Sequence, residues 1–153
     1  MKNSLKLKEK LYAKCLNILN VKLQNIEHVI FEIQQSLTSE TKSSAGDKHE
    51  TGRAMMQLER EKAGQQLAEI LKQKELFSKI NITKSSNKAC LGSIVLTTQA
   101  NYFLSISVGE IIIDSISFFA ISPNTPIGLL LLGKEVGDKI AFRDQKITIK
   151  NII

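Results

Sequence analysis

Two acidic residues three positions apart, Asp47 and Glu50, have the types and spacing best suited to chemistry in this 153-residue chain. Carboxylates at positions i and i+3 lie on one face of a helical turn. Mg²⁺ prefers hard oxygen ligands and keeps several waters, so such a pair can share the ion with a partner and with phosphate groups. A second metal ion can lower the pKa of a bound water and stabilise a leaving oxygen. The pair is therefore a candidate site for metal-assisted hydrolysis.

The same spacing also fits a structural role at the start of a helix. Asp47 would be the N-cap residue and Glu50 would occupy position N3, which is close to a capping box. The two roles are compatible, because a capping carboxylate can still present its free oxygen. The spacing alone leaves both interpretations open.

Three other residues invite a chemical interpretation. His49 lies between the two carboxylates and could extend them into a small metal cluster, but it has no partner at the spacing of a zinc site. We interpret it as a solvated surface residue. Cys90 could be a nucleophile, but both histidines lie in the first half of the chain, away from it. We interpret Cys90 as a half-buried thiol, and Cys15 and Cys90 as free thiols of a reducing compartment.

The elements that would position the acidic pair are two long helices. No proline or glycine interrupts residues 1–45, and apolar residues recur there at alternating steps of four and three, as in a coiled-coil seam. These residues are Tyr12, Leu16, Leu19, Leu23, Ile26, Ile30, Ile33 and Leu37.

Residues 54–80 predict the second helix, with a less regular seam that includes Arg60 and Lys74. Its apolar members are Met56, Ala63, Leu67, Ile70 and Phe77. Gly64 costs this helix about 1 kcal/mol relative to alanine, and with Ala63 it predicts a close approach of the two helices. Residues 1–80 are thus expected to form an antiparallel coiled-coil hairpin, whose polar tip lies near residues 38–52.

The periodicity changes after residue 80. Residues 81–89 are polar and predict a linker, and residues 90–153 contain β-type runs rich in isoleucine, valine and phenylalanine. Pro126 fits the start of a short helix and Gly133 its C-cap. We expect an α+β protein, in which an antiparallel sheet with one short helix follows the hairpin.

Adjacent aromatic residues in the predicted strands point to opposite faces of the sheet. One member of Tyr102/Phe103 and one of Phe118/Phe119 are therefore candidates for an exposed docking surface. These four residues and Phe142 could also line a pocket for prolyl isomerisation, although aromatic residues at strand spacing more often belong to a core.

Residues 121–138 read ISPNTPIGLLLLGKEVGD. This run resembles the C-terminal domain of the bacterial transcript-cleavage factors GreA and GreB, whose pattern there is close to ISPxSPLGxALLGKxxGD. Gly46, Asp47 and Glu50 match the Gly-Asp-x-x-Glu of that family's coiled-coil tip. The tip also departs from the family pattern, because the residues that replace its apolar, serine, asparagine and tyrosine positions are Lys48, His49, Thr51 and Ala54. The polar stretch 38–45 has no clear counterpart.

The resemblance implies an FKBP-like second domain that docks on RNA polymerase, while the hairpin enters the secondary channel. Asp47 and Glu50 would share a Mg²⁺ ion with the polymerase, which then hydrolyses the 3′ end of a backtracked RNA. The chain would be a cofactor protein rather than an enzyme, and it would bind no cofactor alone. The partner-binding residues implied by the shared motif are Ser122, Pro123, Pro126, Gly128, Gly133 and Lys134.

The charge and composition of the chain limit the kinds of partner that we expect it to bind. A net charge of +6 suggests an anionic partner such as a nucleic-acid machine, but the lysines are scattered and arginine is rare, so sequence-specific DNA binding is not expected. No segment has the pattern of a signal peptide or a membrane span, so we expect a cytoplasmic monomer with no membrane contact.

Two other functions remain open from the sequence. One is a non-catalytic binder of the secondary channel that inhibits or modulates the polymerase, which Lys48 favours. The other is a coiled-coil interaction protein that pairs two hairpins into a dimer.

Overall fold

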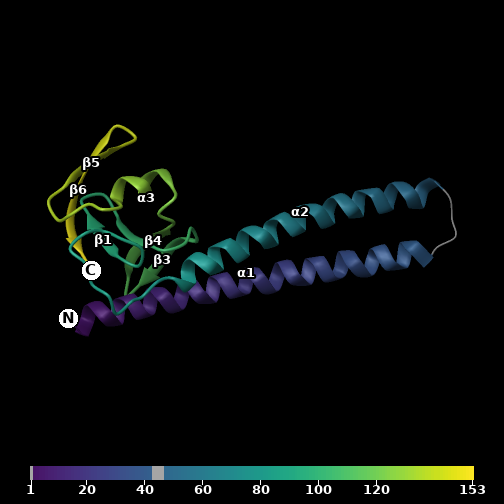
Figure 1. Ribbon diagram of the computed structural model, residues 1–153, viewed down its shortest axis with the longest axis horizontal. Coiled ribbons are helices and arrows are strands. Elements are labelled where there is room, and N and C mark those ends of the chain that lie inside the picture. Colours follow the sequence, from purple (N-terminus) through teal and green to yellow (C-terminus); the bar gives the residue numbers. More distant parts are fainter. Residues whose placement is uncertain (1, 43–46) are drawn as a thin grey trace. The chain divides into compact units, whose positions relative to one another are not determined.

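The computed structural model describes residues 2–42 and 47–153, and the side chains of residues 3–39 and 51–153. Two long helices, α1 (Lys2–Lys42) and α2 (Asp47–Ser78), precede a sheet that carries one short helix (Figure 1). The expected fold class is confirmed in this respect. None of the helices in the described residues is long and apolar enough to cross a membrane.

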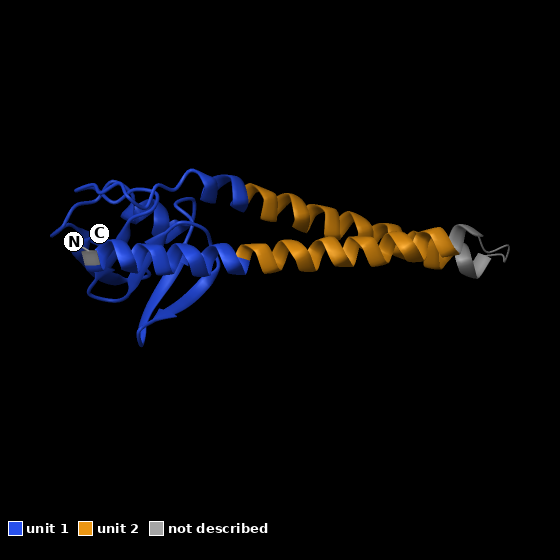
Figure 2. Ribbon diagram, turned by 90° about the horizontal axis from the view of Figure 1, so that it is seen from below, with its two compact units in different colours: residues 1–18, 73–153 blue, residues 19–72 orange. Residues whose placement is uncertain are grey.

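The chain divides into two compact units, and the division falls within the helices rather than at residue 81. The first unit contains residues 1–18 and 73–153, and the second contains residues 19–72 (Figure 2). Residues 2–18 of α1 and residues 73–78 of α2 therefore belong with the sheet, and the rest of both helices lies in the second unit.

The second unit is the helical hairpin, and its seam is the one that the sequence predicts. Leu19, Ile26 and Ala63 are buried. The remaining seam positions of this unit are half-buried, namely Leu23, Ile30, Ile33 and Leu37 on α1 and Met56, Arg60, Leu67 and Ile70 on α2. His28 is exposed, and its Nε2 lies 3.0 Å from Oε1 of Glu32 one turn further.

Gly64 does not make room for the facing helix. A Cβ added there would meet one described atom within 4 Å outside the helix backbone, the Nη1 of Arg60 at 3.1 Å. Ala63 is the small residue that the hairpin buries.

We therefore expect Gly64→Ala to raise the unfolding free energy of the hairpin by about 0.5–1 kcal/mol, because alanine loses less backbone entropy in a helix. The flexible end of Arg60 has to move only slightly to admit the methyl group. Urea denaturation followed by helical circular dichroism measures this difference, and Ala63→Gly is the control of opposite sign. A less stable Gly64→Ala variant would mean that Arg60 is held in place.

The seam of α2 shifts where the helix joins the first unit. Lys74, which the sequence places on the seam, is exposed, while Gln73 is half-buried and Phe77 and Ile80 are buried. A step of three residues replaces the expected step of four after Ile70, so the buried stripe passes through Gln73 instead. The Phe77 ring then stacks on Tyr12 of α1, with ring centroids 4.4 Å apart.

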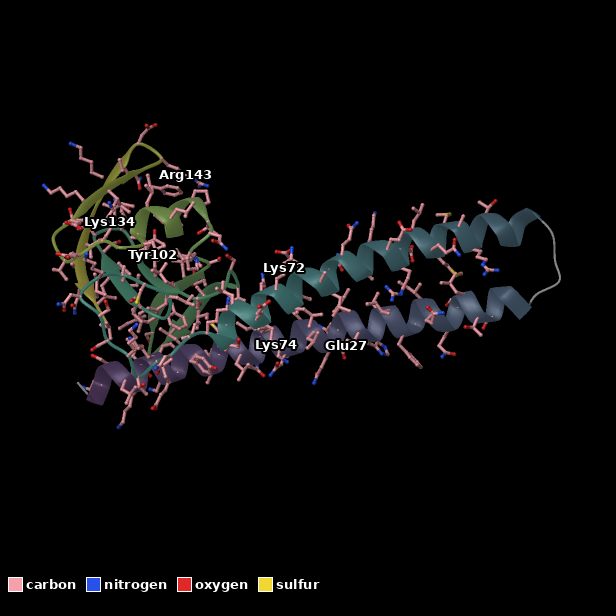
Figure 3. All side chains as sticks on the ribbon, viewed as in Figure 1. Glu27, Lys72, Lys74, Tyr102, Lys134 and Arg143 are labelled. Atoms are coloured by element: carbon pink, nitrogen blue, oxygen red, sulfur yellow. The ribbon has the colours of Figure 1, made fainter. Side chains whose placement is uncertain are left out.

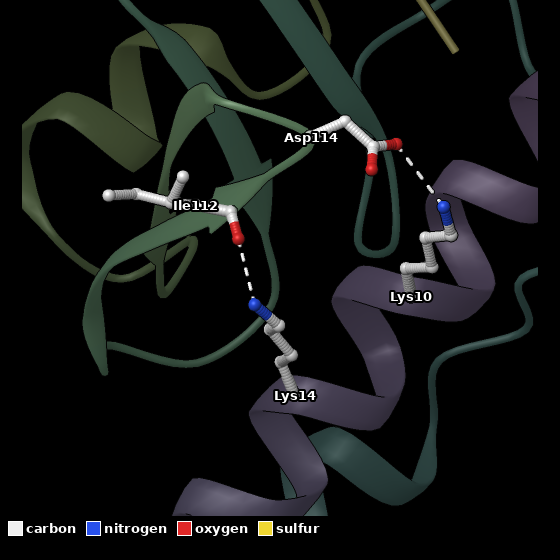
Figure 4. A network of polar contacts seen from close by, with 4 residues as sticks. All are labelled: Lys10, Lys14, Ile112 and Asp114. Carbon is white, nitrogen blue, oxygen red and sulfur yellow. Dashed lines mark hydrogen bonds and ion pairs between the residues drawn. The ribbon is translucent and has the colours of Figure 1, made fainter.

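The start of α1 buries a wider face than a coiled-coil seam, because it contacts the sheet as well as α2. Leu11 and Cys15 are fully buried, although neither lies on the predicted seam. Two lysines of α1 also reach the β3–β4 hairpin (Figure 4). Lys14 Nζ donates to the carbonyl oxygen of Ile112 at 2.8 Å, and Lys10 pairs with Asp114 at 3.2 Å.

The sheet has six strands in the order β3-β4-β2-β1-β6-β5. The strands are β1 (Ile94–Thr97), β2 (Asn101–Leu104), β3 (Gly109–Ile113), β4 (Ile116–Ile121), β5 (Lys139–Phe142) and β6 (Gln145–Ile152). The short helix α3 (Pro126–Leu131) follows β4.

The sheet is mixed, whereas the sequence predicted an antiparallel one. Strands β2 and β4 pair in parallel, and every other described pair is antiparallel. The chain leaves β2, reverses into β3 at the sheet edge and reverses again at the turn of Asp114 and Ser115. Strand β4 therefore fills the place between β3 and β2 and runs parallel to β2.

The sheet buries both of its faces. On one face, Ser105 contacts Cys15 of α1, and Phe103, two residues earlier, is fully buried. On the other face, Val95 and Leu104 form a core cluster with Ile127 and Leu131 of α3. Tyr102 packs against this second cluster (Figure 3).

The aromatic pairs alternate between the faces as predicted, but none is a strongly exposed docking residue. Phe103 and Phe118 are buried, and Tyr102 and Phe119 are half-buried. The rings of Tyr102 and Phe119 lie 6.3 Å apart across the parallel strand pair. Core packing therefore accounts for these aromatic residues without a catalytic pocket.

Candidate functional site

The acidic pair lies in the first turn of α2, since the helix begins at Asp47. The side chains of Asp47, Glu50 and His49 are outside the described residues, and so is Gly46. Both interpretations of the pair, metal ligation and helix capping, therefore stay predictions.

The shared motif of residues 121–138 forms a capped turn that starts α3. Thr125 is the N-cap residue: its Oγ1 accepts a hydrogen bond from the N–H of Gly128 at 3.1 Å and donates to the carbonyl oxygen of Ser122 at 2.7 Å. Pro126 follows as the first helical residue, where proline loses no helix hydrogen bond. Threonine thus performs the capping role that serine can also fill at this position.

Ser122 holds the loop before the helix. Its hydroxyl oxygen accepts the N–H of Asn124 at 3.2 Å, and its own N–H donates to Oγ of Ser107 at 3.1 Å. The carbonyl oxygen of Ser122 also accepts the N–H of Thr125 at 3.1 Å. The loop is therefore held by Ser107, which lies outside the motif, and by Asn124 and Thr125 within it.

Gly128 is buried because the loop passes directly over it. A Cβ added at this position would lie 2.2 Å from the carbonyl oxygen of Ser122 and 3.0 Å from the Cα of Pro123. No side chain fits there, so glycine is the residue that this capped turn requires.

Gly133 and Lys134 connect the end of α3 to the segment before β1. Gly133 has a φ of +79°, which favours glycine, and its N–H donates to the carbonyl oxygen of Ala89 at 2.7 Å. The N–H of Ala89 donates in return to the carbonyl oxygen of Lys134 at 2.8 Å. Two of the residues implied as partner contacts thus have a backbone role in the fold.

The apolar residues that α3 presents to solvent were not singled out by the sequence. Ile127 and Leu131 face the core, whereas Leu129 is 61% exposed and Leu132 is 42% exposed. We call Leu129 and Leu132, the C-cap residue that directly follows α3, the α3 face, because residues three apart lie on one side of a helix. With Pro126 as the helix start, the sequence places residues i+1 and i+5 on one side and i+3 and i+6 on another, but which side is buried depends on where the sheet lies.

The predicted partner-binding residues therefore fall into two groups. Ser122, Gly128 and Gly133 shape the turn, and Gly128 is buried. Pro126 is exposed beside the α3 face, and Pro123 and Lys134 are half-buried. The motif therefore forms a capped turn and a short helix that hold Leu129 and Leu132 at the surface.

The two cysteines differ in environment. Cys15 is fully buried, and burial raises the pKa of its thiol to about 11, an effect that the hydrogen bond with Ser105 at 3.9 Å partly opposes. Cys90 is half-buried, as expected, and its Sγ lies 3.5 Å from Oγ of Ser93.

We expect the unfolding free energy of the wild-type protein to fall by about 2 kcal/mol more than that of Cys15→Ala as the pH rises from 9 to 11. The folded state holds the Cys15 proton more tightly than the unfolded state. Its contribution is therefore complete below pH 9 and is lost as the pH rises through the folded pKa. Urea denaturation of both proteins under reducing conditions measures the difference, and parallel pH profiles would contradict it.

The fold is thus a helical hairpin followed by a mixed sheet with one short helix. No protein-family model matches the chain. No curated protein matches it either.

Two solved structures are similar to it over most of the chain. The crystal structure of the GreA factor homolog 1 (Gfh1) protein of Thermus thermophilus is 17% identical, with 93% of this chain and 94% of that chain covered and a TM-score of 0.37. A structure of the transcription factor Gfh1 is 18% identical, covers 92% of each chain and has a TM-score of 0.35. These values are too low for the likeness to carry an argument on function.

Proposed function

We propose that this chain is a Gre-like transcription elongation factor that binds RNA polymerase. In this proposal the sheet domain docks on the polymerase and the hairpin tip enters its secondary channel. Asp47 and Glu50 share a Mg²⁺ ion with the polymerase there and promote its cleavage of backtracked RNA. The chain supplies two carboxylates and a means of delivery, and the polymerase supplies the remaining ligands and the RNA.

One observation carries the proposal: the motif shared with the Gre family forms a single structural device. Thr125 caps α3, Gly128 admits the Ser122 carbonyl, and Gly133 closes the helix end. This capped turn belongs to a domain that follows a helical hairpin in the chain. The second helix of the hairpin begins with the Asp-x-x-Glu of the predicted tip. The order of these features along the chain is the one that the family resemblance implies.

The α3 face is the docking surface that we propose. Leu129 and Leu132 are exposed leucines on one side of a helix fixed at both ends, and exposed apolar groups of this kind are typical of interaction sites. Rim cations such as Lys134 would add charge complementarity to an acidic partner.

We expect Leu129→Ser with Leu132→Ser to weaken binding to core RNA polymerase by at least about tenfold, because the α3 face is the proposed centre of the interface, where the few residues that cost more than about 1 kcal/mol on truncation cluster. Fluorescence anisotropy of the labelled protein measures the affinity. Ile112→Ser with Ile116→Ser is the matched control, since these residues of the same domain are 54% and 52% exposed. Equal losses in both variants would contradict docking through α3.

A second function differs from the first in chemistry alone. Lys48 stands between the two carboxylates in the sequence, and a cation there opposes Mg²⁺ binding. In that case the chain would occupy the channel and inhibit or modulate the polymerase without promoting cleavage. Inhibition of transcription without cleavage would support this function.

A further inference from the structure

The first unit contains a cavity of about 400 Å³ that the proposed function does not use. Three segments line it: the first turns of α1, residues 82–85 and the end of the chain after Lys150. The volume lies within the range of about 300–1,000 Å³ that is usual for small-molecule sites.

Lys8 is the unusual residue of this cavity. It is 4% exposed, and its Nζ donates to the carbonyl oxygen of Lys84 at 3.2 Å. It makes no ion pair with a carboxylate of the described residues. An ammonium group has three N–H donors, and a buried lysine is almost always paired with a negative charge. Lys8 therefore has free donors, and no carboxylate of the described residues lies within ion-pair distance of it.

The environment of Lys8 has an energetic cost. Desolvation lowers the pKa of its ammonium group, and Cys90 acts in the opposite direction. A charge in such a place is stabilised when an anion joins it, because the desolvation has already occurred.

The other groups around the cavity also suit an anion. Ser4, Ser85 and Asn151 line it, and none of their side-chain donors makes a hydrogen bond to the described residues. Lys84 adds a second positive charge, and no acidic side chain lines the cavity. These groups can donate to an oxyanion without repelling it.

Apart from Thr83, whose hydroxyl donates to Oδ1 of Asn81 at 2.6 Å, the rest of the lining is apolar. Leu5, Ile82, Ile152 and Ile153 surround the polar groups, so a bare inorganic ion would leave this surface uncovered. A ligand with a charged head and a short hydrocarbon body would cover both.

We propose that this cavity binds a small organic oxyanion, a carboxylate or a phosphate monoester with a short apolar body, whose charge pairs with Lys8. The head group accepts from Lys8 Nζ, from Ser4 and Ser85, and from the amide of Asn151. The apolar body lies against the isoleucines. Such a ligand would join the start of α1, the segment before the sheet and the last strand, all within the first unit.

Three probes with the same six-carbon chain test the proposal: hexanoate, hexyl phosphate and the neutral alcohol hexanol. We expect one or both anions to shift the methyl resonances of Ile82 and Ile152 saturably and to raise the Tm with concentration, as linkage requires. The stronger of the two anions identifies the head group. Hexanol should bind at least about tenfold more weakly, since it lacks the charge. Equal binding of hexanol, or no binding of either anion, would overturn the proposal.

Lys8→Met is the decisive variant, because methionine keeps the length and apolar stem of lysine without the charge. Its stability without ligand should equal or exceed that of the wild type, since replacing an unpaired buried charge by an apolar group is favourable. Its affinity for the anions should fall by at least about tenfold. Lys79→Met, at an exposed position outside the cavity lining, is the matched control and should bind as the wild type does. Unchanged anion affinity in Lys8→Met would overturn the proposal.

Discussion

Gly128→Ala should lose about 3 kcal/mol of unfolding free energy or more, at the upper end of the range of about 1–3 kcal/mol for substitutions that force a side chain into occupied space. The added Cβ would lie 2.2 Å from the Ser122 carbonyl oxygen, 2.9 Å from Thr125 Oγ1 and 3.0 Å from Pro123 Cα. Two of these atoms belong to the backbone, so no rotamer change relieves the overlap. The loop has to move, which would break the N-cap of α3 and the hydrogen bonds that Ser122 makes.

Urea denaturation followed by tyrosine fluorescence measures this loss, because both tyrosines, Tyr12 and Tyr102, belong to the first unit. Gly133→Ala is the matched control. A Cβ at position 133 would meet nothing within 4 Å, so this variant should lose only the free energy that a positive φ costs alanine, about 1–2 kcal/mol. Similar losses in the two variants would mean that the loop over Gly128 adapts freely and that the motif has no special geometry.

The second large effect is on activity. We expect Asp47→Asn with Glu50→Gln to reduce stimulated RNA cleavage by at least about 100-fold, because neutral amides are poor ligands for a shared Mg²⁺ and cannot replace two carboxylate charges. Affinity for the polymerase should remain within about twofold of the wild type, since docking is assigned to the other unit.

The choice of amides separates the two roles of the acidic pair. Asparagine is as good an N-cap residue as aspartate. If Asp47 serves only to cap α2, the Asp47→Asn variant therefore keeps that function. Glu59→Gln with Glu61→Gln is the charge-matched control, at exposed positions further along α2. Full cleavage by the Asp47/Glu50 variant would assign the pair to capping, and an equal loss in the control would point to the charge of the helix as a whole.

The parts of the fold that follow from local patterns could be predicted from the sequence. The heptad steps from Leu19 to Leu37 place the same residues on the seam that the hairpin buries. Pro126 and Gly133 mark the two ends of α3 because each has a backbone restriction or freedom that helix ends require. In these cases the residues of a single helix determine its buried face and its ends.

The parts that depend on contacts between distant segments could not be predicted. Leu11 and Cys15 lie off the heptad seam, and they are buried because the sheet meets α1 there. The parallel pairing of β2 and β4 follows from the order of strands in space, and no run of residues encodes that order by itself. The burial of Lys8 without a carboxylate partner could not be predicted either, because three distant segments of the chain form its surroundings.

The candidate site divides in the same way. The motif predicted where a rigid turn would form, because proline, threonine and glycine have strong local preferences. It did not predict that Leu129 and Leu132 remain exposed, since that depends on which side of α3 the sheet covers.

The most direct test of the proposed function is transcript cleavage in backtracked elongation complexes of the cognate RNA polymerase with Mg²⁺. The account predicts that the wild-type chain shortens the 3′ end of the stalled RNA, that it does nothing to the same RNA without polymerase, and that Asp47→Asn with Glu50→Gln abolishes the effect. Cleavage that the Asp47/Glu50 variant supports fully would contradict the assignment of the tip. Absence of cleavage together with absence of polymerase binding would contradict the proposed function as a whole.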